Sequence, residues 1–256
     1  NGFNEEFMVS DAIREAYNQY GAMCGDLHTD LHECVGHGSG KLLPGVSKDA
    51  LKEHASTIEE ARADLFGLYY MADPKLVELG LLPNEHAYES YYYQQMMNGL
   101  MTQLVRIEPG KDIEEAHMRN RQLIAMWVYK HADGAVEIIE REGKHYLQIN
   151  DFAEVRRLYG ELLKEIQRIT SEGDYAAAKA MVEDYAVKVE PTLHNEILAR
   201  YAKLNLAPYK GFVNPVYTPV FDAEGNITDV TLDYTEGYVE QHLRYSRDYS
   251  WLPDVN

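Results

Sequence analysis

The spacing of two histidines constrains this chain more than any other feature of its sequence. His32 and His37 stand five residues apart in the stretch "HECVGH", and the apolar pattern before them is helical. On an ideal α-helix, side chains four residues apart diverge by about 40°, whereas side chains five residues apart diverge by roughly 140°. An undistorted helix would therefore point the two imidazoles in different directions.

A local change of helical period removes this conflict. A π-bulge inserts one residue into a helix; at roughly 4.4 residues per turn, five residues cover about 410° and leave the two rings about 50° apart. Gly36 stands just before the second histidine and lowers the steric cost of such a distortion. If both histidines bind one metal ion, the sequence predicts a bulged helix between His32 and His37.

The stretch "EEARAD", which begins at Glu59, offers a third ligand. A catalytic zinc site uses three protein ligands and keeps one position open for water. Glu60 follows His37 by 23 residues, enough for a loop and a second helix that returns beside the first. Asp64 shares a helix face with Glu60, and Asp64 and Glu59 are placed to accept the other N–H of each ligating imidazole. These residues predict one Zn²⁺ per chain, bound by His32, His37 and Glu60.

Two neighbouring side chains offer alternative ligands. His28 and His32 have the ordinary spacing of four, but Thr29 stands where a catalytic glutamate would follow, so we expect His28 to be a neighbour of the site. Cys34 is a potential zinc ligand, but on the helix it points away from the histidines, and we expect a buried apolar thiol. In a further alternative, the His and Glu side chains of this stretch are simply exposed on a helix and bind no metal.

Most of the remaining chain has the pattern of helices with recognisable ends. Caps and turn residues predict helices after Ser10, from Ser47 to near Pro74, from Asn84 to about Ile107, from about Asp112 to His131, and after Asp151 and Asp174. Residues 135–150 and 216–234 alternate around Gly-containing turns and predict β-hairpins. Pro219 makes the first strand of the second hairpin an edge strand or an irregular one. Residues 204–215 have the composition of a linker.

Charge and cysteine content narrow the possible partners. The chain has 24 Lys and Arg against 42 Asp and Glu, a net charge of -18, which opposes binding to nucleic acid or anionic lipid. Its apolar stretches, such as "LIAMWVY", are far shorter than a membrane span. The two cysteines, Cys24 and Cys34, permit a reducing compartment, and we expect a cytoplasmic protein. Without an initial Met or a signal sequence, the chain is expected to be part of a longer protein.

The two motifs together resemble the signatures of the dipeptidyl peptidase III family, H-E-x-x-G-H and E-E-x-R-A-[ED]. The chain continues as "GHGSGKL", contains "AHMRNR" at 116–121, which is similar to the family's A-H-M-x-x-R, and later contains the similar segment "SEGDYAAAKAMVEDYA". The likeness runs from about residue 25 to the end. It corresponds to the C-terminal part of a family member, with the short interval between motifs that is found in bacterial members.

The resemblance implies roles for individual residues. The family's zinc ligands correspond to the three residues named above, and Glu33 corresponds to the general base and proton shuttle. His117 is similar to a family histidine that contacts the substrate carbonyl and stabilises the oxyanion. Arg121 matches an arginine of the same motif, for which we expect a substrate-binding role.

The resemblance also implies a fold and an activity. We expect a mostly α, zincin-like catalytic lobe with a bulged zinc-binding helix over residues 1–211, including a minor hairpin near 135–150. A β-hairpin and a helix over 212–256 are expected to contact the N-terminal lobe of the same parent protein. The activity implied is zinc-dependent release of dipeptides from the N-terminus of short peptides. In the family, the groups that bind the free N-terminus come largely from sequence before the point where this chain begins.

Three alternatives remain open from the residues alone. A zinc aminopeptidase and a zinc endopeptidase use the same metal chemistry and differ in how the substrate is anchored. From a different class, the chain would be a non-catalytic helical module with a structural zinc. Closed structural sites usually have four Cys or His ligands, whereas this chain offers three ligands and an adjacent glutamate.

Overall fold

A computed structural model describes residues 2–206 and 211–249, and the chain forms two compact units with the division between Asn205 and Leu206. The division expected between residues 211 and 212 stays a prediction. The linker expected at 204–215 lies partly outside the described residues.

The first unit is predominantly helical, which confirms the expected mostly α fold. Its elements in chain order are α1 (Phe3–Phe7), α2 (Asp11–Leu31), the π-helical turn η1 (His32–His37), the 3₁₀ turn η2 (Lys52–His54), α3 (Ala55–Met71), α4 (Pro74–Glu78), α5 (Ala87–Leu100), the 3₁₀ turn η3 (Thr102–Arg106), α6 (Ala116–His131), β1 (Val136–Arg141), β2 (Lys144–Ile149), α7 (Phe152–Glu172), α8 (Tyr175–Tyr185) and α9 (Pro191–Lys203).

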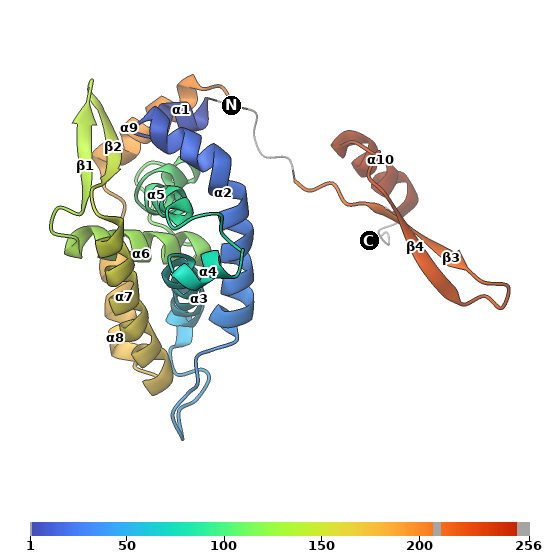
Figure 1. Ribbon diagram of the computed structural model, residues 1–256, viewed down its shortest axis with the longest axis horizontal. Coiled ribbons are helices and arrows are strands. Elements are labelled where there is room, and N and C mark those ends of the chain that lie inside the picture. The colour runs from blue at the N-terminus through green and yellow to red at the C-terminus, as the bar shows by residue number, and fades with distance from the viewer. Residues whose placement is uncertain (1, 207–210, 250–256) are drawn as a thin grey trace, which may run out of the picture. The chain divides into compact units, whose positions relative to one another are not determined.

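Helix α3 is the central element of the first unit (Figure 1). It packs against α2, α6 and α7, while α5 packs against both α2 and α6. Ile58 and Leu65 of α3 have no exposed surface, nor do Tyr92 of α5 and Tyr159 of α7. Burial of each of the two aliphatic side chains is worth roughly 1.5–3 kcal/mol. This packing fixes where the motif residues of α2 and α3 meet.

Three of the predicted helix caps are confirmed. Ser10, Asp151 and Asp174 each accept a hydrogen bond from the backbone N–H three residues further on, at 3.4, 2.9 and 3.1 Å. Each cap satisfies one of the donors that the first turn of a helix leaves unpaired. Helices α2, α7 and α8 therefore begin where the sequence predicts.

Other helix boundaries differ from the prediction. The helix expected to begin after Ser47 begins at Ala55, because Lys52 adopts a left-handed φ of 48° that an α-helix does not accommodate. The Ser47 hydroxyl instead accepts a hydrogen bond from Asp49 N–H in a turn. Helix α5 ends at Leu100 and is followed by η3, rather than continuing to Ile107.

Both predicted hairpins are present. Strands β1 and β2 pair antiparallel, as do β3 (Val216–Phe221) and β4 (Ile227–Asp233) of the second unit, which also contains α10 (Tyr238–Tyr249). Pro219 lies opposite Val230, and the register shifts one residue later, between Val220 and Phe221, so this strand is irregular as predicted. Among the described helices, none combines the length and the apolar character needed to cross a membrane.

Candidate metal centre

The bulged helix predicted between the two histidines is present. Helix α2 passes directly into the π-helical turn η1, which spans His32–His37. The rings of His32 and His37 lie close together, with centroids 4.7 Å apart and planes at 86°. The change of helical period accommodates the extra residue between them.

Gly36 allows η1 to lie directly against α3. It is buried, and a Cβ at this position would stand 2.6 Å from the Cα and 2.8 Å from the Cβ of Ala63. Such distances lie well inside van der Waals contact, and one of the two atoms belongs to the backbone. A residue without a side chain is therefore needed where the histidine-bearing turn approaches the helix of Glu60 and Asp64.

Replacement of Gly36 by alanine is expected to lower the free energy of unfolding by about 1–3 kcal/mol, as overpacking commonly does. Urea unfolding measures this change. Gly25→Ala on α2 is the matched control, since its Cβ would meet only the tip of the Tyr91 ring at 3.7 Å. The control should be neutral or stabilising by up to about 1 kcal/mol. Equal stability of the two variants would contradict the assigned role of Gly36.

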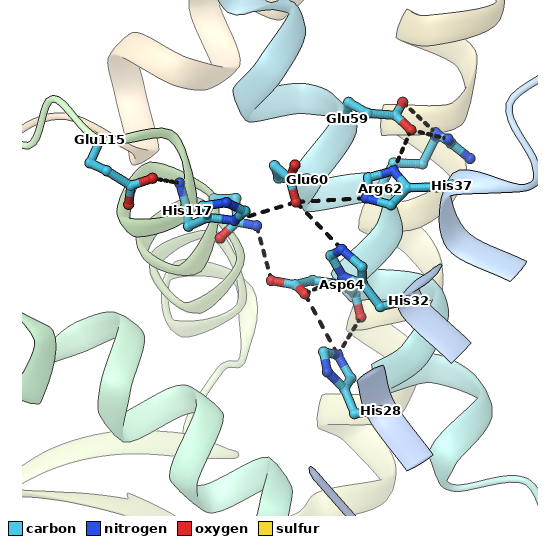
Figure 2. Close-up of polar contacts among 10 residues, drawn as sticks. His28, His32, His37, Glu59, Glu60, Arg62, Asp64, Glu115 and His117 are labelled. Carbon is cyan, nitrogen blue, oxygen red and sulfur yellow. Dashed lines mark hydrogen bonds and ion pairs between the residues drawn. The ribbon is translucent and has the colours of Figure 1, made fainter. Parts of the chain in front are cut away.

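Glu60 of α3 lies between the two imidazoles. Its Oε2 is 3.4 Å from Nε2 of His32 and 3.9 Å from Nε2 of His37, and it is buried without a hydrogen-bond partner. Figure 2 shows Glu60 at the centre of the cluster, with both rings turned toward it. A buried acceptor left unpaired costs about 1–3 kcal/mol, or more when charged. A cation among these atoms would satisfy it, and two imidazoles with one carboxylate are a donor set of catalytic zinc sites. The residues fit a zinc ion.

Glu33 is the exposed carboxylate of the same cluster. His32, Glu33 and His37 each offer one ligand-type atom, and these atoms all lie within 4.8 Å of one another. Two glutamates therefore adjoin the histidines, and their environments differ. The buried, unpaired oxygen of Glu60 favours it as the ligand, while the exposed side chain of Glu33 is free to exchange protons with water or substrate.

Asp64 orients the first imidazole. Its Oδ1 accepts a hydrogen bond from Nδ1 of His32 at 2.7 Å, and this bond raises the pKa of His32. Burial acts to raise the pKa of Asp64, but the hydrogen bond from His32 and the nearby charges of His28, His32 and Arg121 hold it below its ordinary value. Asp64 is therefore ionised at neutral pH. With Nδ1 donating to Asp64, Nε2 is the nitrogen of His32 that faces Glu60.

Glu59 orients the second imidazole in the same manner. Its Oε1 accepts from Nδ1 of His37 at 2.9 Å, and the buried guanidinium of Arg62 donates to Oε1 at 2.6 Å and to Oε2 at 3.2 Å. Burial acts to raise the pKa of Glu59, but Arg62 and His37 lower it. Arg62 also donates to the hydroxyl of Ser39, which itself donates to Gly36 O at 2.8 Å. Arg62 and Ser39 thus tie the end of η1 to α3.

His28 and the two cysteines lie outside the cluster of His32, His37 and Glu60. His28 is buried, and its Nε2 is 3.2 Å from Asp64 O and 3.8 Å from Asp64 Oδ1. Burial lowers the pKa of His28. The expectation of a buried Cys34 is wrong, since this thiol is exposed and Cys24 is the buried one. The reason is that η1 packs through Gly36, so the three residues before Gly36 face outward.

Helix α6 brings His117 to Glu60. Nδ1 of His117 lies 3.4 Å from Glu60 Oε2, and the side chain is 55% exposed. The helix begins at Ala116 because the carboxylate of Glu115, rather than Asp112, accepts from the first free N–H groups. Arg121 is half-buried and lines, with Asp64, a small cavity of about 10 Å³. The roles expected for His117 and Arg121 stay predictions.

Three further residues belong to the site but were not identified from the sequence: Asn120, Arg62 and Ser39. Asn120 is buried and donates from Nδ2 to Asp64 Oδ2 at 2.9 Å. A signal existed for it, since it stands three residues after His117 and so shares its helix face. The signal for Arg62 was its position within the stretch "EEARAD". Ser39 lies in a loop, where no periodicity indicates which way a side chain points.

Comparison with known proteins gives consistent matches. A sequence model described as "Peptidase family M49" matches residues 47–213. "Dipeptidyl peptidase 3" of Mus musculus is 24% identical over 240 residues, covering 75% of this chain and 32% of that protein. The protein of the same name from Homo sapiens is 25% identical over 223 residues, covering 68% of this chain and 30% of that protein. The chain thus spans about a third of the length of these relatives.

Solved structures give matching results. The structure of DPP III from Caldithrix abyssi aligns with a TM-score of 0.57 and 26% identity, covering 77% of this chain and 34% of that one. The structure of dipeptidyl-peptidase III from Corallococcus sp. strain EGB aligns with the same TM-score of 0.57 at 20% identity, covering 78% and 34%, which shows likeness of fold alone.

Proposed function

Since the chain belongs to peptidase family M49, we propose that it supplies the zinc-binding catalytic lobe of a longer protein that releases dipeptides from the N-terminus of short peptides. The observation that carries the proposal is the buried, unpaired Oε2 of Glu60 between His32 Nε2 and His37 Nε2. The proposed ligands are these three residues, with one zinc ion per chain.

Each residue of the cluster has a proposed task. A zinc ion held there would supply Lewis acidity, which makes a water molecule acidic near pH 7 and polarises the scissile carbonyl. Glu33 accepts the proton of the attacking water and passes it to the leaving amine. His117 donates a hydrogen bond to the carbonyl oxygen as it becomes negative. Asp64 and Glu59 keep the imidazoles oriented throughout.

Loss of the oxyanion donor gives a test of His117. His117→Ala is expected to lower kcat by about 10²- to 10³-fold, as removal of one such donor commonly does. Zinc content should remain at one per chain, because His117 is not a proposed ligand. Steady-state kinetics on a short peptide measure the change, and unchanged turnover would remove His117 from the mechanism.

The second unit offers a surface for the proposed N-terminal lobe. The side chains of Tyr217, Phe221, Ile227, Val230 and Leu232 are exposed by between 45 and 65%, and the pairing of the strands places them on one face of the hairpin. A lone two-stranded hairpin is marginally stable in water. We propose that the remaining part of the parent protein covers this face. We propose a cytoplasmic location, with which two free cysteines are compatible.

Metal and product analysis test the proposed function. The full chain should bind one zinc, and an anomalous-scattering map should place it between His32, His37 and Glu60. Dipeptides released from a pentapeptide support the proposal, whereas single residues indicate an aminopeptidase and internal fragments an endopeptidase. A zinc-loaded parent protein that cleaves no peptide would favour a non-catalytic module. The three-ligand cluster with an adjacent free glutamate favours catalysis over that alternative.

A further inference from the structure

Asn120 is a buried amide that contacts the metal centre only through a carboxylate. It lies on α6 with 1% of its surface exposed, and its Nδ2 donates to Asp64 Oδ2 at 2.9 Å. The other oxygen of this carboxylate, Oδ1, accepts from His32 Nδ1 at 2.7 Å. The two oxygens of Asp64 are thus divided between one imidazole and one amide.

The orientation of the amide follows from the chemistry of its partner. An ionised carboxylate has only acceptors, so the amide must turn its NH₂ group toward Asp64 and its oxygen away. That oxygen, Oδ1 of Asn120, is buried and has no hydrogen-bond partner. An unpaired buried acceptor is unfavourable for stability, which makes this amide a poor choice for packing alone.

Helices α3 and α6 contact each other at the site through two matched pairs of side chains. Glu60 and Asp64 are four residues apart on α3, and His117 and Asn120 are three apart on α6, so each pair shares a helix face. His117 faces Glu60, with 3.4 Å between Nδ1 and Oε2, and Asn120 faces Asp64. The contact that brings His117 to the site therefore also fixes the Asp64 carboxylate.

We propose that Asn120 is a positioning residue for the metal ligand His32 and acts through Asp64. The inference rests on the proposed zinc site. Held at both oxygens, the carboxylate cannot rotate about its Cβ–Cγ bond, and the His32 ring keeps its Nε2 directed toward Glu60. Without Asn120, Oδ2 of Asp64 loses the amide donor that holds it, and the carboxylate can turn away from His32.

Zinc affinity measures this role. Asn120→Ala in the full chain should raise the Kd for zinc by about tenfold, at the lower end of what loss of an outer hydrogen-bond partner of a metal ligand costs. Competition with a chelator of known zinc affinity gives the Kd. Gln122→Ala is the matched control, because Gln122 is a buried amide on the same helix that donates to Lys188 O, away from the site, at 2.8 Å. Its Kd should equal that of the unaltered chain.

Two further variants separate positioning from packing. Asn120→Leu keeps a similar volume but has no donor, so it should weaken zinc binding as much as Asn120→Ala. In an Asp64→Ala background, Asn120→Ala should cause no further loss, because the two residues act in series. The unfolding midpoint of each metal-free variant, measured alongside, reports whether the fold is retained.

The outcomes distinguish this inference from the proposed function. An unaltered chain that binds no zinc would overturn both. Zinc binding by the unaltered chain with an unchanged Kd in the folded Asn120→Ala or Asn120→Leu variant would overturn the positioning role alone. An additive loss in the Asp64→Ala background would also overturn it, since Asn120 would then act by another route. Weaker zinc binding in both Asn120 variants, with no further loss when Asn120→Ala is added to Asp64→Ala, supports it.

Discussion

Glu60→Ala is expected to abolish stoichiometric zinc binding. The substitution removes one of three proposed ligands and leaves only the two imidazoles of η1. The loss in affinity should exceed the roughly 10- to 100-fold that removal of an outer hydrogen-bond partner costs. Metal analysis after dialysis against a weak chelator measures it.

The control for this experiment is a glutamate in η2, the turn that precedes the helix of Glu60. Glu53 accepts from the Tyr175 hydroxyl at 2.7 Å and lies outside the histidine cluster, so Glu53→Ala should keep one zinc. If Glu60→Ala retained zinc and Glu33→Gln lost it, the assignment of Glu60 as a ligand would be contradicted. That result would make Glu33 the third ligand, an arrangement that the proximity of Glu33 to His32 and His37 also allows.

Glu33→Gln is expected to keep zinc and lose turnover. The amide has nearly the size of the carboxylate but cannot accept the proton of the attacking water. General acid–base catalysis of this kind is typically worth about 10²–10⁴ in rate, or roughly 3–5 kcal/mol of activation free energy. The measurements are kcat on a short peptide and zinc content on the same preparation. Full activity with full zinc content would rule out Glu33 as the general base.

The sequence predicted the local features of the centre because these depend on short-range geometry. Two histidines five residues apart can face one metal ion only if the helix contains a π-turn, and η1 spans His32–His37 as predicted. The caps at Ser10, Asp151 and Asp174 follow from hydrogen bonds to backbone groups three residues away. The start of the helix expected after Ser47 was wrong. Ser47 is a good capping residue, but the left-handed backbone conformation of Lys52 interrupts the helix, which begins only at Ala55.

Side-chain environments were less predictable than helix positions. Cys34 was expected to be buried because it points away from the histidines, yet that side of η1 is not covered by α3 and the thiol is exposed. Helical periodicity shows which residues share a face, but it does not show which face another helix covers. The same limit explains why Asn120 was not identified.

Two motifs, the bulge that the first one requires, and a mostly helical fold with two hairpins can all be read from the sequence. These follow from backbone hydrogen bonding and side-chain spacing within single segments. Three features appear only in the folded chain: Glu60 Oε2 is buried and unpaired, Arg62 and Ser39 hold η1 to α3, and Asn120 reaches Asp64. Each of these contacts depends on how closely separate segments pack, and core packing sets those distances over many residues that no single motif contains.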